Sequence, residues 1–508
     1  MTTYRKRALL LAAATVAAGL TATAAPAATA VPTPARPAPS GPELDWHRCS
    51  PDLPAAQECA ELPVPLDYDD PGGRQLTLAV SRIRSDRPEA RRGTLVVIPG
   101  GPGGSGVQRL TQKAEALQRE LAGAYDLVAF DPRGVGASTT ASCDLAPEDR
   151  YLTSLRSWPG PNGEITENIA RSRRIAEACA RSGGPELRSF TTANQVRDLD
   201  RFREALGERR LSAWGTSYGT YVGAVYAQQY PERTDRWVLD SSGDPDPKRV
   251  ARGWLANMSQ GAEDRFPDFA AWAAHPDRDR DGLRLGAAPR EVEPLLLALA
   301  ARLDREPRPS TAPGAPLTGN GLRQALQNAL YGDAAFASFA RLVKAAQAPA
   351  GTPAGTPELP KELAAPLRNE DAAVMVGVIC NDVAWPDVPV AAYRRAVATD
   401  RARHPLTAGM PANVLPCSFW KTPTQKPTRI TGDGPSNILM LQSRRDPATP
   451  LSGGLKMREA LGDRARMVTV EQGGHGLYLG NGNACGNRAV TEFLISGRRP
   501  ARDTGCAN

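Results

Sequence analysis

The pentapeptide Gly215-Thr216-Ser217-Tyr218-Gly219 places a serine between two glycines. It follows the apolar run LSAW and precedes the helix-like stretch TYVGAVYAQQY. A sharp turn from a strand into a helix strains its central residue, and small flanking residues make such a turn possible. The pattern therefore predicts that Ser217 is a nucleophile.

A serine hydroxyl needs a base that takes its proton and an acid that orients the base. Asp446 follows the predicted strand NILMLQS, and His475 lies in EQGGHGL after the next predicted strand. The chain order Ser, Asp, His is the one found with this type of turn. The three other histidines lie in contexts typical of structural or surface residues. We therefore expect Ser217, Asp446 and His475 to form a catalytic triad.

The stretch VVIPGGPGGSGVQRL, residues 96–110, reads as a strand, a glycine-rich loop and a helix. The same pattern is found in dinucleotide-binding proteins, but an exported protein meets little dinucleotide. Acyl transfer needs backbone N–H donors for the negatively charged oxygen of its intermediate. One donor is expected from the residue after the nucleophile, Tyr218, and the other from Gly101 in this loop.

These residues need a scaffold, and the pattern of apolar runs predicts one. From residue 44 to 243, strand-like runs alternate with helix-like stretches, which indicates an α/β fold with a mostly parallel central sheet flanked by helices. Residues 244–435 are rich in Ala, Arg and Leu with helical periodicity. Strands resume in residues 436–508. The sequence thus predicts one core in two parts, 44–243 and 436–508, with an inserted helical cap.

The N-terminus carries the marks of export. Arg5, Lys6 and Arg7 precede an apolar run and small residues, which predicts a signal peptide over residues 1–30 with cleavage near Ala30. Residues 31–43 form a Pro-rich leader. Removal of residues 1–30 lowers the formal charge from +7 to +4, because it removes three basic side chains. This mild charge, without basic blocks, predicts no nucleic-acid partner, and no stable membrane association is expected.

An even number of cysteines, eight, in an exported chain favours disulfides over metal ligands. Without C-x-x-C spacing, and with four histidines in the whole chain, no metal site is expected. The number of cysteines leaves their connectivity open, but proximity along the chain favours four pairs. These are Cys49 with Cys59, Cys143 with Cys179, Cys380 with Cys417, and Cys485 with Cys506.

With these residues the chain resembles the secreted bacterial tripeptidyl aminopeptidases, a serine peptidase group within the proline iminopeptidase family of α/β-hydrolases. The resemblance runs over nearly the whole mature chain, through PGGPGGSG, FDPRGVGAS, GTSYGTYVGAVYAQQYPERTDRWVLDS, VICNDVAWP, LPCSFW, LQSRRDPATP and GGHG. It implies the same triad and oxyanion donors, and removal of short peptides, often tripeptides, from free N-termini. Pro99 departs from the His usual in iminopeptidase-type relatives. We expect a monomer that needs no cofactor.

An enzyme that releases peptides of fixed length must hold the α-ammonium of its substrate at a set distance from the nucleophile. Three extended residues span roughly 10 Å. Asp382, in VICNDVAWP of the predicted cap, is our candidate for this anchor; a helix cap or an ion pair with an arginine is an equal alternative. Two other functions stay open: an esterase, lactonase or small-amide hydrolase with the same triad, and a binding protein without catalysis.

Overall fold

The computed structural model describes residues 43–248, 250–349, 351–352, 355–423, 425–481 and 483–506. The predicted signal peptide, and the predicted leader up to residue 42, lie outside the described residues. Within the described ranges, no helix is long and apolar enough to span a bilayer.

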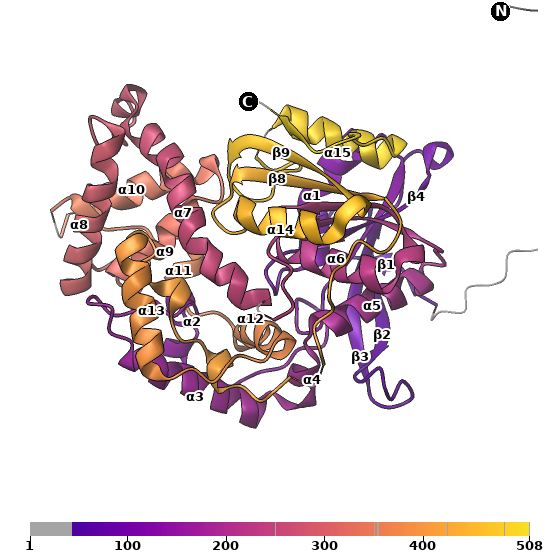
Figure 1. Ribbon diagram of the computed structural model, residues 1–508, viewed down its shortest axis with the longest axis horizontal. Coiled ribbons are helices and arrows are strands. Elements are labelled where there is room, and N and C mark those ends of the chain that lie inside the picture. Colours follow the sequence, from indigo (N-terminus) through magenta and orange to yellow (C-terminus); the bar gives the residue numbers. More distant parts are fainter. Residues whose placement is uncertain are drawn as a thin grey trace, which may run out of the picture. The chain divides into compact units, whose positions relative to one another are not determined.

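A ten-stranded sheet runs through the described chain in the order β1-β2-β3-β5-β4-β6-β7-β8-β9-β10 (Figure 1). Its strands are β1 (His47–Arg48), β2 (Gln57–Pro65), β3 (Gln75–Ile83), β4 (Gly93–Ile98), β5 (Tyr125–Phe130), β6 (Leu211–Thr216), β7 (Thr234–Asp240), β8 (Ile438–Arg445), β9 (Ala465–Gly473) and β10 (Thr504–Cys506). Strands β1, β2, β3 and β5 pair antiparallel, and all pairs from β5 to β10 are parallel. The predicted mostly parallel α/β fold is confirmed.

Both faces of the central strands are covered by helices. In β4, Val96 and Ile98 pack on one face while Leu95 and Val97 pack on the other, because side chains alternate along a strand. One face is covered by α1 (Gly106–Leu121) and α15 (Ala484–Ser496). The opposite face is covered by α5 (Thr192–Ala205), α6 (Tyr218–Gln229) and α14 (Leu451–Leu461).

A second group of helices lies between β7 and β8 in the sequence and beside the sheet in space (Figure 1). It comprises α7 (Val250–Ala274), α8 (Val292–Arg305), α9 (Gly319–Ala329), α10 (Phe336–Gln347), α11 (Lys361–Ala364), α12 (Asn369–Asp382) and α13 (Val390–Arg403). Most of these helices share a hydrophobic core of their own, in which Phe269, Phe336 and Phe339 pack ring against ring. We call this group the cap.

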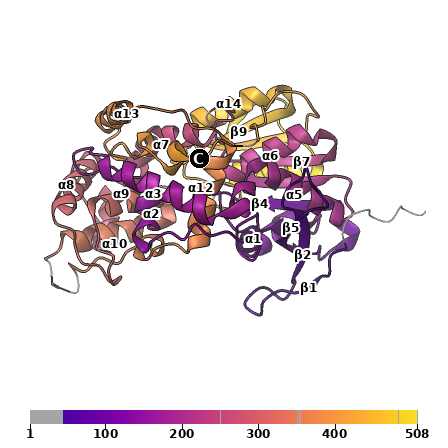
Figure 2. The same cartoon turned by 90° about the horizontal axis from the view of Figure 1, so that it is seen from below.

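The cap recruits a segment that the sequence assigned to the first part of the core. Helices α2 (Leu152–Leu155) and α3 (Thr166–Ser182), with α4 (Gly184–Ser189) after them, come before β6. Figure 2 shows α2 and α3 among the cap helices. Leu152 packs in the cap core, and the Trp158 indole donates a hydrogen bond of 3.0 Å to Gln324 of α9. Helix periodicity reveals an apolar face but not which neighbour it packs against, so the sequence could not show this.

Four disulfides cross-link the described chain, and they join the cysteine pairs that proximity along the sequence favours. Cys49–Cys59 joins the residue after β1 to β2, and Cys485–Cys506 joins α15 to β10. Cys143–Cys179 ties the segment before α2 to α3. Cys380–Cys417 ties α12 to the short helical turn at Pro416–Phe419.

Candidate active site

Ser217 lies in the turn between β6 and α6 with φ +60° and ψ −126°. A positive φ strains a residue with a side chain, and such strain persists only where the surroundings enforce it. The flanking glycines are sterically required: a Cβ on Gly215 would lie 2.4 Å from the Gly219 carbonyl oxygen, and one on Gly219 would lie 2.5 Å from the Ile98 carbonyl oxygen. The close packing of β6, α6 and β4 therefore holds the serine at the end of the sheet.

Asp446 and His475 lie in hydrogen-bond contact on the loops after β8 and β9. His475 Nδ1 is 3.0 Å from Asp446 Oδ1 and 2.9 Å from Oδ2. The carboxylate is buried and also accepts hydrogen bonds from the backbone N–H groups of Ala448 and Thr449, each at 2.8 Å, and from the Thr449 hydroxyl. It is therefore held rigidly toward the imidazole.

Burial and the neighbouring charges act in opposite directions on the pKa of His475. Burial lowers the pKa of His475, but the Asp446 carboxylate, its hydrogen bond and the charge of Asp240 outweigh burial, so the pKa is raised above its ordinary 6.5. The turn at His475 and Gly476 lies against the nucleophile turn, since a Cβ on Gly476 would be 3.3 Å from Thr216 Cγ2. This geometry suits a base that is oriented by an acid.

A second buried carboxylate, Asp240 at the end of β7, was not singled out from the sequence. Its two oxygens accept hydrogen bonds of 2.9 Å from the backbone N–H groups of Leu477 and Tyr478, in the loop that contains His475. Its backbone carbonyl accepts the Ser217 N–H at 3.0 Å. Burial raises the pKa of Asp240. One residue thus links the histidine loop to the nucleophile turn, and its position at the end of an apolar strand, in RWVLD, was the available signal.

The cap also reaches His475. The backbone carbonyl of Tyr331, after α9, accepts the His475 N–H at 2.9 Å. The Tyr331 ring meets the imidazole edge to face, with centroids 5.0 Å apart. No sequence pattern marked Tyr331, because its contact crosses more than 140 residues.

The glycine-rich loop packs against the serine. A Cβ on Gly100 would lie 2.8 Å from Ser217 Cβ, and Gly101 has φ +119°, which favours glycine. Tyr218 is the first residue of α6, where N–H groups lack intrahelical partners. The predicted donors Gly101 and Tyr218 both line a cavity together with Ser217.

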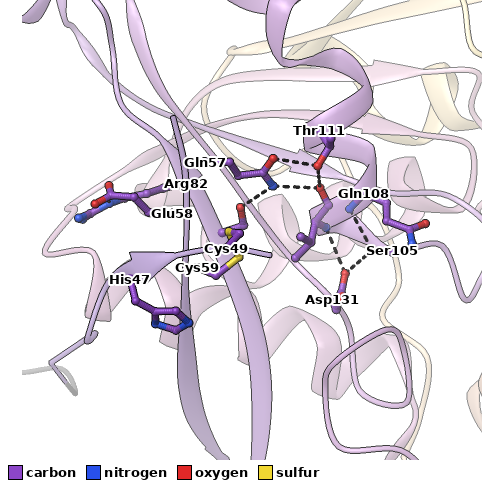
Figure 3. The surroundings of a disulfide bond; sticks show 12 residues. His47, Cys49, Gln57, Glu58, Cys59, Arg82, Ser105, Gln108, Thr111 and Asp131 are labelled. Carbon is purple, nitrogen blue, oxygen red and sulfur yellow. Dashed lines mark hydrogen bonds and ion pairs between the residues drawn. A yellow bond between two sulfur atoms is a disulfide. The ribbon is translucent and has the colours of Figure 1, made fainter. Parts of the chain in front are cut away.

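The helix after this loop is fixed by a network that Figure 3 shows beside the Cys49–Cys59 disulfide. Ser105 caps α1 by accepting the Gln108 N–H at 3.0 Å. Asp131 in turn accepts the Ser105 hydroxyl at 2.6 Å and the Val107 N–H at 3.1 Å. In a dinucleotide-binding protein an acid after the second strand would bind ribose. Here Asp131, which follows β5, holds the start of α1 instead.

The cavity beside Ser217 has a volume of about 170 Å³ and lies between the sheet and the cap. Its walls are mostly apolar, with Trp254 and Met258 from α7 and Met375 and Ile379 from α12. The Cys380–Cys417 disulfide lines it as well. The cap helices therefore form the surface that a substrate would meet above the serine.

Asp382 does not lie where an anchor for the substrate was expected. It is not among the described residues that line this cavity. Its carboxylate accepts the Thr192 N–H at 2.7 Å and the Thr192 hydroxyl at 2.5 Å, at the N-terminus of α5. Burial raises its pKa to about 6. The structure corrects the expectation toward its alternative: Asp382 ends α12 and caps another helix.

No group of three or more His, Cys, Asp or Glu side chains suited to a metal ion occurs among the residues that the structure describes.

Comparison with known proteins finds relatives that are named as peptidases or esterases. Residues 405–506 match the family described as TAP-like protein. A tripeptidyl aminopeptidase from Streptomyces lividans is 35% identical over 493 residues, covering 93% of this chain and 88% of the relative. Carboxylesterase B from Mycobacterium tuberculosis is 29% identical and covers 98% and 96%. Serine protease Hip1 from the same organism is 27% identical and covers 92% and 91%.

The sheet order, the strained serine after β6 and the loops after β8 and β9 define a serine hydrolase with the α/β-hydrolase fold. The peptidases among the relatives place it with the serine peptidases of this fold. The chain belongs to the tripeptidyl aminopeptidase family.

Proposed function

We propose that this protein is a secreted serine exopeptidase that releases short peptides, tripeptides in particular, from free N-termini through an acyl-enzyme. The observation that carries the proposal is the strained turn at Ser217, which lies against the turn that holds an imidazole oriented by Asp446, in a chain 35% identical to a tripeptidyl aminopeptidase. The four disulfides suit an extracellular protein.

In the proposed mechanism Ser217 attacks the scissile carbonyl while His475 takes its proton. The N–H groups of Tyr218 and Gly101 hold the oxyanion of the tetrahedral intermediate. His475 then gives the proton to the leaving nitrogen, and the peptide bond breaks. Asp446 keeps His475 in the required tautomer and stabilises its cation. Water, activated by the same histidine, releases the peptide from Ser217.

The cap supports an exopeptidase over an endopeptidase. Helices α7 and α12 cover the cavity above Ser217, so an extended chain end enters it more readily than a folded loop.

The test is hydrolysis of two Ala-Ala-Pro anilides, one with a free and one with an acetylated N-terminus, by the mature protein and by Ser217→Ala. We expect cleavage of the free substrate only, and a loss of roughly 10⁶-fold in kcat in the variant. Equal cleavage of both anilides would contradict the requirement for a free N-terminus.

A second candidate, hydrolysis of esters or small amides with the same residues, is favoured by the relative named carboxylesterase B. A p-nitrophenyl ester assayed beside the anilides separates the two. Turnover of the ester without turnover of either anilide would make this the function.

A further inference from the structure

Arg156 follows α2 and lines the cavity beside Ser217. Among the described residues that line the cavity, it alone carries a charged side chain, and none is an acid. Its neighbours there include the apolar Leu155, Met258 and Met375. An isolated cation in such a wall needs an explanation.

The guanidinium of Arg156 has no ionic partner within the described part of the chain. Its Nη1 lies 4.0 Å from the sulfur of Met258, and its Nε is buried without a hydrogen-bond acceptor. Arg133, also in contact with the core, is different: it donates to both oxygens of Asp198 and to the carbonyls of Pro65 and Leu66.

Removing a cation from water without a partner is unfavourable, and a paired arginine such as Arg133 avoids that cost. Arg156, which is partly buried, carries part of this cost. A ligand with an anionic group would remove it, and a guanidinium binds carboxylates by two parallel hydrogen bonds.

Arg156 shares the cavity with a residue that contacts His475. Tyr331 lines the same cavity and contacts the His475 ring. Because the histidine of a hydrolase must reach the leaving nitrogen, groups beside it face the leaving part of the substrate.

We propose that Arg156 binds a carboxylate of the peptide substrate on the leaving side of the scissile bond. The carboxylate is either the free C-terminus of a single leaving residue or the acidic side chain of that residue. This inference rests on the proposed peptidase function, and it names the substrate class of the same site: peptides with a carboxylate directly after the cut.

The experiment uses four tetrapeptides that begin with Ala-Ala-Ala. Two end in Ala, as free acid and as amide; two end in Glu-amide and Gln-amide. We expect the wild-type protein to cleave at least one carboxylate peptide roughly tenfold faster in kcat/KM than its neutral match. The first pair reports on the C-terminus, and the second reports on the side chain.

In Arg156→Gln we expect this ratio to fall close to one, whereas Arg156→Lys keeps part of it because the charge remains. Arg280→Gln is the matched control, since it removes the same charge from an exposed arginine of the cap outside the cavity. The ratio compares the kcat/KM values of two substrates for one protein. A lower concentration of folded protein changes both values equally and leaves the ratio unchanged.

A wild-type ratio close to one in both pairs, or an unchanged ratio in Arg156→Gln, would overturn the inference. An equal loss on all four peptides in Arg156→Gln would also overturn it. If the wild-type protein cleaves none of them, the proposed function fails instead. The Kd values of the four peptides for Ser217→Ala, with and without Arg156→Gln, then decide the inference by the same ratios.

Discussion

Charged side chains beneath the cavity and in its walls differ in how fully they are hydrogen-bonded. Beneath the cavity, in the buried sheet loops that we call the floor, the carboxylates of Asp446 and Asp240 accept hydrogen bonds at both oxygens. In the wall, which the cap builds, Arg156 lies unpaired among methionines and other apolar side chains.

This difference separates two tasks. Rigid, fully bonded groups would keep the proposed base and the proposed nucleophile in one geometry, so that the site needs no reorganisation during the reaction. Methionine-rich walls adapt to different ligands, and an unpaired cation selects among them. We therefore expect changes on the floor to lower kcat and changes in the walls to alter KM and substrate preference.

The largest effect should come from Asp446→Asn. The variant removes the charge that orients His475, and the expected loss in kcat is about 10⁴-fold. The base must be neutral to accept a proton, so activity of the wild-type protein should fall as pH drops through a pKa above 6.5. In the variant this acidic limb should move to lower pH, because the raising charge is gone.

The measurement is kcat/KM against pH for both proteins, with the exposed Asp463→Asn as control. An acidic limb at the same pH in wild type and Asp446→Asn would show that Asp446 does not set the pKa of the base.

Asp240→Asn should have the next largest effect. An amide has one acceptor oxygen, so one of the backbone N–H groups of Leu477 and Tyr478 would lose its partner. An unsatisfied buried group costs about 1–3 kcal/mol, which corresponds to a loss of roughly 5- to 150-fold in kcat if it falls on the histidine loop.

Asp235→Asn provides the comparison within the same strand, because Asp235 lies near the other end of β7 in a partly exposed pair with Arg92. Kinetics and thermal unfolding are measured for both. Equal effects of the two substitutions would remove the special role given to Asp240.

The smallest effect is expected in the wall. Replacing Cys380 and Cys417 by Ala frees α12 from the segment opposite it, and both ends of this disulfide line the cavity. We expect KM to rise by up to about tenfold, at most about 1.4 kcal/mol, with kcat little changed.

Replacing Cys485 and Cys506 by Ala is the control, since that disulfide lies outside the cavity. Both double variants should lose about 2–5 kcal/mol of stability. A fall in kcat for the Cys380 and Cys417 variant, or a matching rise in KM for the control, would break the division between floor and walls.

Much of the scaffold was accessible from the sequence. Alternating apolar runs and helical periodicity indicated the α/β sheet and its insertion, and proximity indicated the disulfide pairs. Local periodicity did not reveal that α2 and α3 join the cap, because an amphipathic helix does not name its partner.

Some contacts of the candidate residues follow from local patterns, and others depend on how distant elements pack. Ser217, Asp446 and His475 stand out from strand-end patterns, and the structure places Asp446 against His475. Asp382 was placed in the insertion, but the direction of its carboxylate toward Thr192 depends on how α12 packs on α5.

The sequence by itself determined which residues have the chemistry and the strained turn for acyl transfer, since a G-x-S-x-G turn and the glycine-rich loop are local in the chain. Only the tertiary structure decided what surrounds them. Asp240 contacts Leu477 and Tyr478, and Tyr331 contacts His475. Arg156 lines the cavity together with residues that are far from it in the sequence. Such contacts follow from packing of distant elements, and no local pattern encodes them.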